Sequence, residues 1–195
     1  LELQSIVFYI LASFSRKSSF SSEAGLKYFI SSTAMSGIFL FSCSIIYGCL
    51  GTLNFSHISL LLVFPFVENL EYLSLLLQVG IFGILIVFLF KLVVAPLHFW
   101  FPQVYDGAPL GSTIIFSIVP KLIMFVVLVR LLLVVPVFIS VLMPFLVVVG
   151  AYSAAFGALL ALKQRRLKKL FIYSSIGQLG LPIAAISFMT YESVA

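Results

Sequence analysis

The chain has 195 residues, of which 63% are hydrophobic and only 9% are charged, and its formal net charge is +5. A soluble domain averages about 25% charged residues, so this chain would leave most of its apolar side chains without an interior to occupy. The composition therefore excludes an ordinary soluble domain and indicates a membrane protein.

Three long stretches without Asp, Glu, Lys or Arg set the fold class: residues 28–67, 131–162 and 170–191. A helix needs about 20 apolar residues to cross the hydrocarbon core. Because lipid offers no water to unpaired backbone groups, spanning segments must be helices or a closed barrel, and these runs do not alternate as barrel strands do. We predict an all-α, polytopic transmembrane helix bundle that forms a single domain over residues 1–195.

The charges and prolines between the apolar runs give the helix boundaries. The first helix, about 14 residues long, is too short to cross the membrane by itself. The chain starts with Leu1 inside a helical sequence and shows no signal or transit sequence. We therefore expect either one piece of a larger protein or an unusual start that depends on neighbouring chains. The predicted helices are 1–14, 28–50, 72–96, 117–135, 138–161 and 170–190, with a shorter helical piece at 108–116.

The cysteines and the known sequence motifs give no indication of a cofactor. Cys43 and Cys49 lie six residues apart on one predicted helix, on nearly opposite faces, which rules out a local disulfide. We interpret them as small apolar residues. The sequence has no C-x-x-C, no His/Cys cluster, no P-loop and no G-x-G-x-x-G fingerprint, so we expect no cofactor, metal or haem in this chain.

The basic residues collect on one side of the predicted topology. The loop 163–169, KQRRLKK, holds five positive charges, and with Arg16, Lys17 and Lys27 this side has eight of the eleven Lys and Arg residues. The connection around 52–71 carries acidic residues only. The positive-inside rule assigns the basic side to the cytoplasm or the mitochondrial matrix. The charge therefore orients the chain among membrane lipid, and we expect no nucleic-acid partner.

Four charged residues lie in apolar surroundings: Glu2, Lys91, Lys121 and Arg130. A charge at the bilayer centre costs about 2.5–3.5 kcal/mol on insertion scales. This cost favours pairing, a wet cavity or a position near an interface. We expect the Arg130 side chain to snorkel to the outer face, and we assign it no proton-carrying role.

The position of Lys91 relative to the membrane has two interpretations. It lies about 30 Å along a helix from Glu71, so it could reach the opposite interface by snorkelling. The next ten residues, LVVAPLHFWF, stay apolar apart from His98, although an interface should bring polar residues soon after the lysine. We therefore favour a helix that is discontinuous at Pro96, at membrane depth, where irregular backbone can line protein or water.

Lys121 directly follows Pro120. If Pro120 starts a helix, Lys121 lies at the positive end of the helix dipole, which disfavours an ammonium, and burial disfavours the charged form as well. Lys121 is then a candidate to exchange a proton near neutral pH. If the helix continues through Pro120, only the burial argument remains. The alternative is a structural lysine bonded to backbone carbonyls.

Glu2 is the acidic residue placed within a predicted span. A carboxylate opposite a buried lysine stabilises the ammonium, by about 2.4 kcal/mol at roughly 7 Å and an effective dielectric near 20. A change in that distance would switch the proton affinity of the lysine. The sequence leaves open whether Glu2 faces Lys91.

Three segments then point to a known family. They are LELQSIVFYILASFSRKSSFSSEAGLKYFI, FKLVVAPLHFWFPQVYDGAPLGSTIIFSIVPK and KKLFIYSSIGQLG, in this order. Together they closely resemble subunit 2 of mitochondrial NADH dehydrogenase (complex I), called subunit N in bacteria, an antiporter-like proton-pumping subunit. The resemblance runs over essentially the whole chain and corresponds to helices 5 to 10 of that family.

The resemblance implies roles for the isolated charges. The family glutamate on helix 5 matches Glu2, the lysine on the discontinuous helix 7 matches Lys91, and the lysine on helix 8 matches Lys121. It implies a glutamate–lysine pair whose separation tunes the lysine, followed by a relay lysine. Pro96 is then the helix break, and His98 is either a relay or supporting residue or simply packs against Trp100.

Two departures from the family pattern matter. The family motif usually has Asp where this chain has Gln103, although Asp106 stands nearby at a position often occupied by Glu. The family lysine on helix 12 has no counterpart here. The resemblance therefore implies either a separately encoded chain that supplies the missing helices or a strongly reduced subunit.

The implied function is proton translocation in the membrane arm of NADH:ubiquinone oxidoreductase, with all redox chemistry in other subunits of the complex. The expected partners are the other membrane-arm subunits, and the expected location is the mitochondrial inner membrane, with the bacterial plasma membrane as the alternative. Two other functions stay open. The chain could belong to a multi-subunit cation/proton antiporter, or it could be a structural membrane spacer that has lost pumping.

Overall fold

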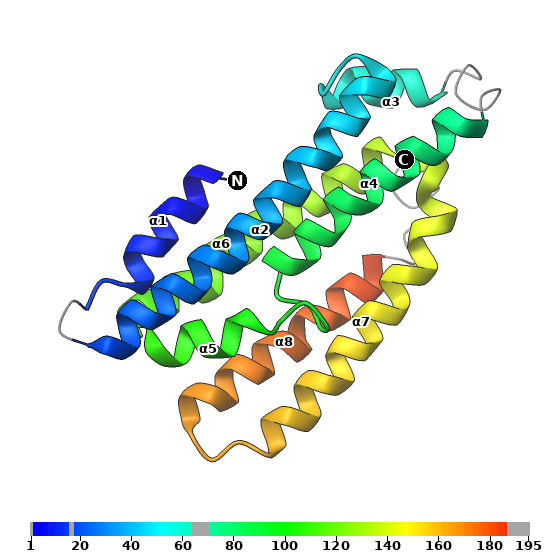
Figure 1. Cartoon of the computed structure of the whole chain (residues 1–195). Helices are drawn as coiled ribbons and strands as arrows, with labels where there is room; N and C mark the ends of the chain where they lie inside the picture. Colours follow the sequence, from blue (N-terminus) through cyan, green and yellow to red (C-terminus); the bar gives the residue numbers. More distant parts are fainter. Residues whose placement is uncertain (1, 16–17, 64–70, 187–195) are drawn as a thin grey trace.

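The computed structural model describes residues 2–15, 18–63 and 71–186, and these residues form helices and no β-strand (Figure 1). The predicted all-α fold is confirmed. In chain order the elements are α1 (Glu2–Ala12), α2 (Ser19–Leu50), α3 (Phe55–Val63), α4 (Glu71–Lys91), α5 (Trp100–Gly107), α6 (Leu110–Val134), a 3-10 turn (Pro136–Phe138), α7 (Ile139–Leu162) and α8 (Leu167–Ile186).

Five helices in the described part of the chain are long and apolar enough to cross a membrane, namely α2, α4, α6, α7 and α8. Each contains at least 20 residues of suitable hydropathy, the length that the hydrocarbon core demands. α1 is apolar but only 11 residues long, as its sequence predicted. The chain is therefore a multi-pass membrane protein.

α2 begins at Ser19, well before the predicted start at residue 28. Its first turns carry Glu23 and Lys27, whose side chains form an i,i+4 ion pair of 2.6 Å along the helix, a pairing that supports helix at its surface. Reading this polar segment as a loop was therefore wrong. The helix ends at Gly51, which has φ of 70° and forms the left-handed cap that glycine adopts without penalty. Arg16 and Lys17 lie outside the described residues.

α3 was not among the predicted helices. Its segment follows Asn54, whose Oδ1 accepts a hydrogen bond of 3.2 Å from the Ser56 N–H, as an N-terminal capping side chain does. Ile58 and Leu62 are buried, so a short apolar run in the second connection became a helix by packing into the core. Glu68, in the same connection, lies outside the described residues.

The helical piece predicted at 108–116 and the helix predicted at 117–135 are one helix, α6. Pro109 precedes its first turn, and the Thr113 N–H donates to the Pro109 carbonyl at 3.0 Å. Pro120 lies inside the helix, where it removes one backbone donor without ending it. Lys121 is therefore not in a first turn, and the dipole argument for Lys121 falls away.

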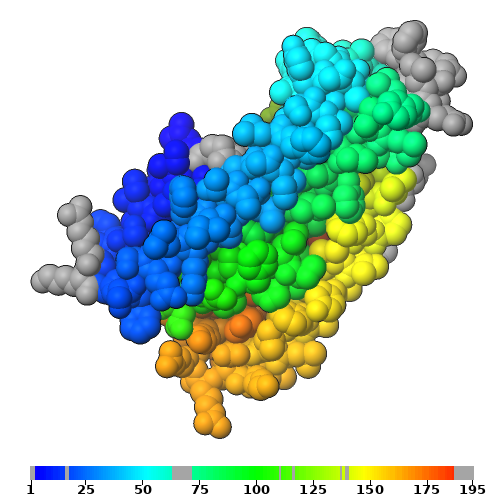
Figure 2. Space-filling model, in the orientation of Figure 1, coloured from blue at the N-terminus to red at the C-terminus, as the bar shows by residue number. Residues whose placement is uncertain are grey.

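Glycines set the close packing of the α7–α8 hairpin. A Cβ built on Gly150 would lie 2.7 Å from the Ala184 backbone nitrogen, and one on Gly157 would collide with the Gly177 backbone. Small residues at such crossings let helix backbones approach, which is a common association mode in membranes. The hairpin therefore forms one layer of the bundle, and α2 with α4 forms another (Figure 2).

The starts of α2 and α8 lie at the same end of the bundle (Figure 1). Gly107, at the end of α5, packs there against Phe20 and Ala24 of α2. The basic loop 163–169 thus shares an end with the α1–α2 turn, as the charge distribution predicted. α4 enters from the opposite end and stops in the middle of the bundle, where α5 takes over.

Candidate functional site

The chain is interrupted between α4 and α5, and the predicted discontinuity is confirmed. The break starts earlier than predicted, because α4 ends at Lys91 and not at Pro96. The Val94 N–H donates to the Leu89 carbonyl and the Val93 N–H to the Phe90 carbonyl, both at 3.1 Å. This is the Schellman pattern of helix termination.

Val93 takes the position in this motif that glycine usually occupies. Its φ is 65°, in the left-handed region where a β-branched residue is a true outlier. Such conformations cost on the order of 1–3 kcal/mol and tend to occur at functional sites. The protein therefore holds this break in place through its surroundings rather than through local preference.

An aromatic cluster supplies those surroundings. The Trp100 Nε1–H donates to the Phe90 carbonyl at 3.3 Å, which satisfies a carbonyl near the end of α4. The Trp100 ring lies 5.5 Å from the Phe90 ring and 5.0 Å from the Tyr28 ring, centroid to centroid. Residues 92–95 are almost fully buried. Side chains of α2 and α5 therefore pack around the interrupted segment and hold it in the core.

Lys91 and Lys121 line the same small cavity. Lys91 is half-buried at the last position of α4, where the negative end of the helix dipole favours its ammonium. The cavity volume is about 20 Å³, enough for one water molecule. Its walls come from α1, α2, α4, the α4–α5 break, α5 and α6. The lining residues are Gln4, Ser5, Phe8, Tyr28, Ser32, Phe90, Lys91, Val93, Trp100, Tyr105, Pro120, Lys121 and Met124.

Ser32 gives this cavity an unused polar atom. Its side chain is only 1% exposed, and within the described residues its Oγ has no hydrogen-bond partner. Buried polar atoms are nearly always satisfied by protein or by ordered water. A cavity of one water volume beside such a hydroxyl, with two lysines in its wall, is polar and roomy enough for a bridging water.

Lys121 is deeply buried, with only 7% of its surface exposed. Its Nζ donates to the Ser175 Oγ at 3.1 Å, across from α6 to α8. The same ammonium lies 4.4 Å from the centre of the Phe101 ring, a cation–π position. The hydrogen bond goes to a side-chain hydroxyl, whereas the structural alternative considered above required backbone carbonyls.

His98 lies apart from the two lysines. Its ring packs edge-on against Phe156 of α7 at 4.7 Å, centroid to centroid, rather than against Trp100. Its Nδ1 is buried without a hydrogen-bond partner in the described part of the chain. His98 is not among the residues that line the cavity, so the structure does not bring it to the lysines.

Glu2 starts α1, but its side chain lies outside the described residues, and its pairing with Lys91 stays a prediction. α1 does reach the site, because Gln4, Ser5 and Phe8 form part of the cavity wall. Arg130 is exposed, and its guanidinium lies 5.9 Å from the Phe55 ring of α3. That places Arg130 near the end of the bundle opposite the basic loop, as predicted.

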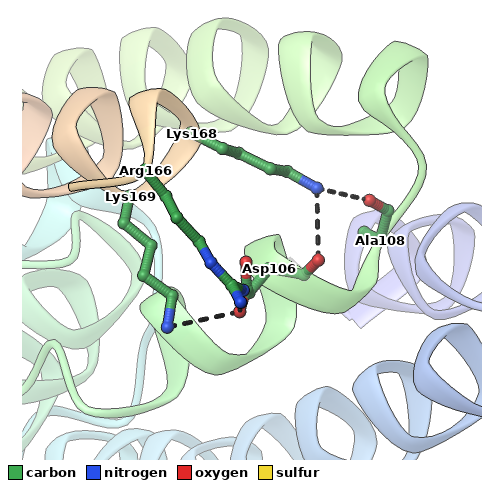
Figure 3. A network of polar contacts seen from close by, with 5 residues as sticks. All are labelled: Asp106, Ala108, Arg166, Lys168 and Lys169. Atoms are coloured by element: carbon green, nitrogen blue, oxygen red, sulfur yellow. Dashed lines mark hydrogen bonds and ion pairs between the residues drawn. The ribbon is translucent and has the colours of Figure 1, made fainter. Parts of the chain in front are cut away.

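A polar clasp ties the end of α5 to the start of α8 (Figure 3). The Asp106 carboxylate lies 3.3 Å from the Lys169 Nζ and 3.8 Å from the Arg166 Nη1. The Lys168 Nζ donates to the Ala108 carbonyl at 2.7 Å and to the Asp106 carbonyl at 3.3 Å. A cation at these carbonyls also complements the negative end of the α5 dipole. Asp106 thus has a defined partner set within the basic loop.

Sequence reasoning missed Ser32, Tyr105 and Ser175 as parts of this site. The available signal was weak, because a hydroxyl in an apolar helix usually bonds its own backbone. Across the described residues, no three His, Cys, Asp or Glu side chains lie close enough to hold a metal ion. The side chains present can exchange protons and hold water.

Two solved structures that are similar to this chain come from respiratory complexes. One is the membrane-bound sulfane sulfur reductase, an archaeal respiratory membrane complex, with a TM-score of 0.84 and 29% identity over 99% of this chain and 38% of that chain. Another is respiratory complex I from Thermus thermophilus with bound aureothin, with a TM-score of 0.74 and 28% identity over 95% of this chain and 38% of that chain.

Curated relatives match the whole chain. NADH-quinone oxidoreductase subunit N of Pelagibacter ubique is 40% identical, and the match covers 100% of this chain and 40% of that protein. NADH-ubiquinone oxidoreductase chain 2 of Oenothera berteroana is 38% identical and is covered to 39%. The chain thus spans about 40% of the length of these relatives. The sequence model of the family described as NADH:quinone oxidoreductase/Mrp antiporter, TM, matches residues 1–195, and the chain therefore belongs to this family.

Proposed function

We propose that this chain moves protons in the membrane arm of a respiratory NADH:ubiquinone oxidoreductase. The names of its relatives, NADH-quinone oxidoreductase subunit N and NADH-ubiquinone oxidoreductase chain 2, support this proposal. The observation that carries it is the single small cavity lined by both Lys91 and Lys121. Lys91 and Lys121 both border a space the size of one water molecule, next to the interruption between α4 and α5. This arrangement suits the transfer of a proton from one lysine to the other.

The proposed step passes one proton from Lys91 to Lys121 through a water molecule in the cavity. An N–H bond of the Lys91 ammonium breaks as the water accepts that proton, and the water gives one of its own protons to the neutral amine of Lys121. Two ammonium groups on one cavity repel each other. A charged Lys91 therefore favours a neutral Lys121, which is the condition for the next transfer.

Glu2 is proposed as the group that sets the proton affinity of Lys91. A carboxylate that approaches the ammonium stabilises it, and one that retreats lets the proton leave. The presence of three α1 side chains in the cavity wall supports this role, because α1 carries Glu2 at its start. Movement of α1 against the α4–α5 break would then control when Lys91 releases its proton.

The proposal places the redox chemistry in other subunits of the complex. The proposed partners are the other membrane-arm subunits, together with a separately encoded chain that supplies the remaining helices of the subunit. The proposed location is the mitochondrial inner membrane. Mass spectrometry of the purified native complex tests these partners directly, because it identifies each subunit that accompanies the chain.

Replacement of the lysines by methionine tests the pumping role. Lys91→Met and Lys121→Met remove the titrating groups and keep side chains of similar length. Both should abolish most proton translocation in reconstituted vesicles, with the complex still assembled. Arg130→Met is the matched control, because it removes an exposed charge from α6 away from the cavity. Normal protons per NADH in Lys91→Met would reject the proposal and favour a structural spacer.

A cation/proton antiporter subunit is the second candidate, because the family description names the Mrp antiporter together with the oxidoreductase. The two candidates share a fold and differ in their assembly. Native purification separates them: flavin and iron–sulfur subunits should accompany the chain in an oxidoreductase. Their absence, with sodium-dependent proton exchange in vesicles, would assign the chain to an antiporter.

A further inference from the structure

We propose that the Ser175 hydroxyl passes the proton of Lys121 to a groove on the other side of α5. This inference rests on the proposed function and extends it to the next step. The groove has a volume of about 580 Å³ and lies among α5, α6 and α8. Its lining is mostly apolar and includes the polar residues Thr113, Ser117, Lys168 and Gln178.

Two aromatic side chains of α5 separate the groove from the cavity. Tyr105 lines both spaces, and Phe101 lines the groove. The two rings are packed closely, with their centroids 3.9 Å apart. Lys121 lines the cavity on one side of this wall, and Ser175 lines the groove on the other.

The bond between Lys121 and Ser175 crosses this wall. The Lys121 Nζ lies over the Phe101 ring at 4.4 Å and reaches the Ser175 Oγ at 3.1 Å. Lys121 is therefore in contact with both spaces, and Ser175 is the polar atom that the ammonium meets on the groove side. A proton that leaves Lys121 toward the groove meets this hydroxyl first.

The present hydrogen bonds suit the charged state of Lys121. The Ser175 hydroxyl donates to the Ile172 carbonyl at 2.8 Å, which leaves its oxygen lone pairs free to accept from the ammonium. When Lys121 is neutral, its nitrogen becomes an acceptor, and the hydroxyl can rotate to donate to it. By rotating, the Ser175 hydroxyl can thus form a hydrogen bond with Lys121 in both the charged and the neutral state of the lysine.

In the proposed transfer step, the proton of Lys121 passes through Ser175 to a water molecule in the groove. The hydroxyl hydrogen first turns from the Ile172 carbonyl toward a water molecule in the groove. An N–H bond of Lys121 then breaks and an O–H bond forms on Ser175, while the original O–H bond of Ser175 breaks and the groove water accepts that proton. Lys121 is left neutral, the water becomes hydronium, and Ser175 is unchanged in composition.

Three substitutions at Ser175 test the hydroxyl while controlling for shape. Threonine and valine differ at this position only by a hydroxyl in place of a methyl group, so Ser175→Thr and Ser175→Val form a matched pair. The complex is reconstituted in vesicles, and protons pumped per NADH oxidised are measured together with the oxidation rate. We expect Ser175→Ala and Ser175→Val to lose at least half of the pumping and Ser175→Thr to keep most of it.

Ser44→Ala is the control for loss of a helix-bound hydroxyl. Ser44 lies on an exposed face of α2, and its Oγ bonds the carbonyl three residues earlier at 2.7 Å, as Ser175 does. This variant should pump normally. Equal pumping in Ser175→Thr and Ser175→Val, whether high or low, overturns the relay role, because the hydroxyl then makes no difference.

Comparison with Lys91→Met separates this inference from the proposed function. If Lys91→Met stops pumping while Ser175→Val pumps normally, the proton leaves Lys121 by another route and only the relay role is rejected. If Lys91→Met pumps normally, the proposed function itself fails. If Ser175→Ala does not assemble, the threonine–valine pair still decides the question through its difference.

Discussion

Val93 follows Lys91 by two residues and turns the chain into the left-handed region, so that the lysine becomes the last residue of α4. The lysine therefore lies at a helix C-terminus in the middle of the bundle rather than within a continuous helix. The conformation that creates this position is unfavourable for valine. The strain is local, and it can be measured by changing one residue.

Val93→Gly and Val93→Ala should separate backbone strain from side-chain packing. Both remove the buried side chain, but only glycine adopts a φ of 65° without penalty. We expect the glycine variant to be more stable than the alanine variant by about 1 kcal/mol, which reverses their usual order in helices. Thermal unfolding of the complex in detergent gives the comparison. An alanine variant of equal or higher stability would show that Val93 carries no strain.

Ser32→Ala should weaken pumping without lowering stability. The buried Oγ has no protein partner among the described residues, so its removal breaks no hydrogen bond within them and should leave the stability of the fold nearly unchanged. Loss of a water partner in the cavity should lower the protons pumped per NADH several-fold.

Ser31→Ala is the control for Ser32→Ala, because the Ser31 hydroxyl bonds the Lys27 carbonyl at 2.8 Å on the same helix. Pumping should be normal in this variant. A Ser32→Ala variant that pumps normally would show that Ser32 does not hold a functional water.

Asp106→Asn should loosen the clasp at the end of α5 slightly and in a salt-dependent way. Asp106 is partly exposed, and its partners Arg166 and Lys169 are 75% and 34% exposed, so the loss should be about 0.2–1 kcal/mol. The difference from wild type should shrink in high salt, since salt screens exposed charges. Unfolding temperatures at low and high salt measure this, and an unchanged difference would contradict an ionic origin.

Lys168→Met should cost more than Asp106→Asn. The Lys168 ammonium donates to two carbonyls at the end of α5, and methionine leaves both without this donor. A hydrogen bond to a charged group contributes about 1.5–3 kcal/mol. The same unfolding measurement ranks the two variants. A smaller effect for Lys168→Met would show that the carboxylate, and not the lysine, holds α5.

Gly157→Ala should disrupt the α7–α8 hairpin. The added Cβ would collide with the backbone of Gly177, and a backbone cannot give way as a flexible side chain can. Gly37→Ala in α2 is the control, since no atom lies within 4 Å of its added Cβ, and it should gain up to about 1 kcal/mol from helix propensity. The yield of assembled subunit reports both. Equal yields would mean that the helices can separate slightly at no cost.

The sequence predicted the spanning helices well because long apolar runs in lipid have few alternatives. It failed where packing decides the structure. α3 formed from a short segment by burying Ile58 and Leu62, and α4 stopped at Lys91 because the backbone turns at Val93, although valine is a poor residue for such a turn. The sequence predicted the end of this helix from Pro96, which lies five residues after its actual end.

The charged residues of the candidate site could be predicted from the sequence, but the residues that contact them could not. Lys91 and Lys121 stood out because charges in apolar runs are costly, and both line the cavity. The bond from Lys121 to Ser175 joins residues 54 positions apart, and no local pattern encodes it. The interpretation of His98 as a relay residue has no support from the cavity lining, whereas the pairing of Glu2 with Lys91 stays a prediction.

α5 links the surface of the protein to its centre. It is a single helix of eight residues, about 12 Å long, with Asp106 of the clasp near one end and Phe101 beneath the Lys121 ammonium near the other. The ion pairs at the basic loop and the ring beneath the Lys121 ammonium are therefore held by the same two helical turns.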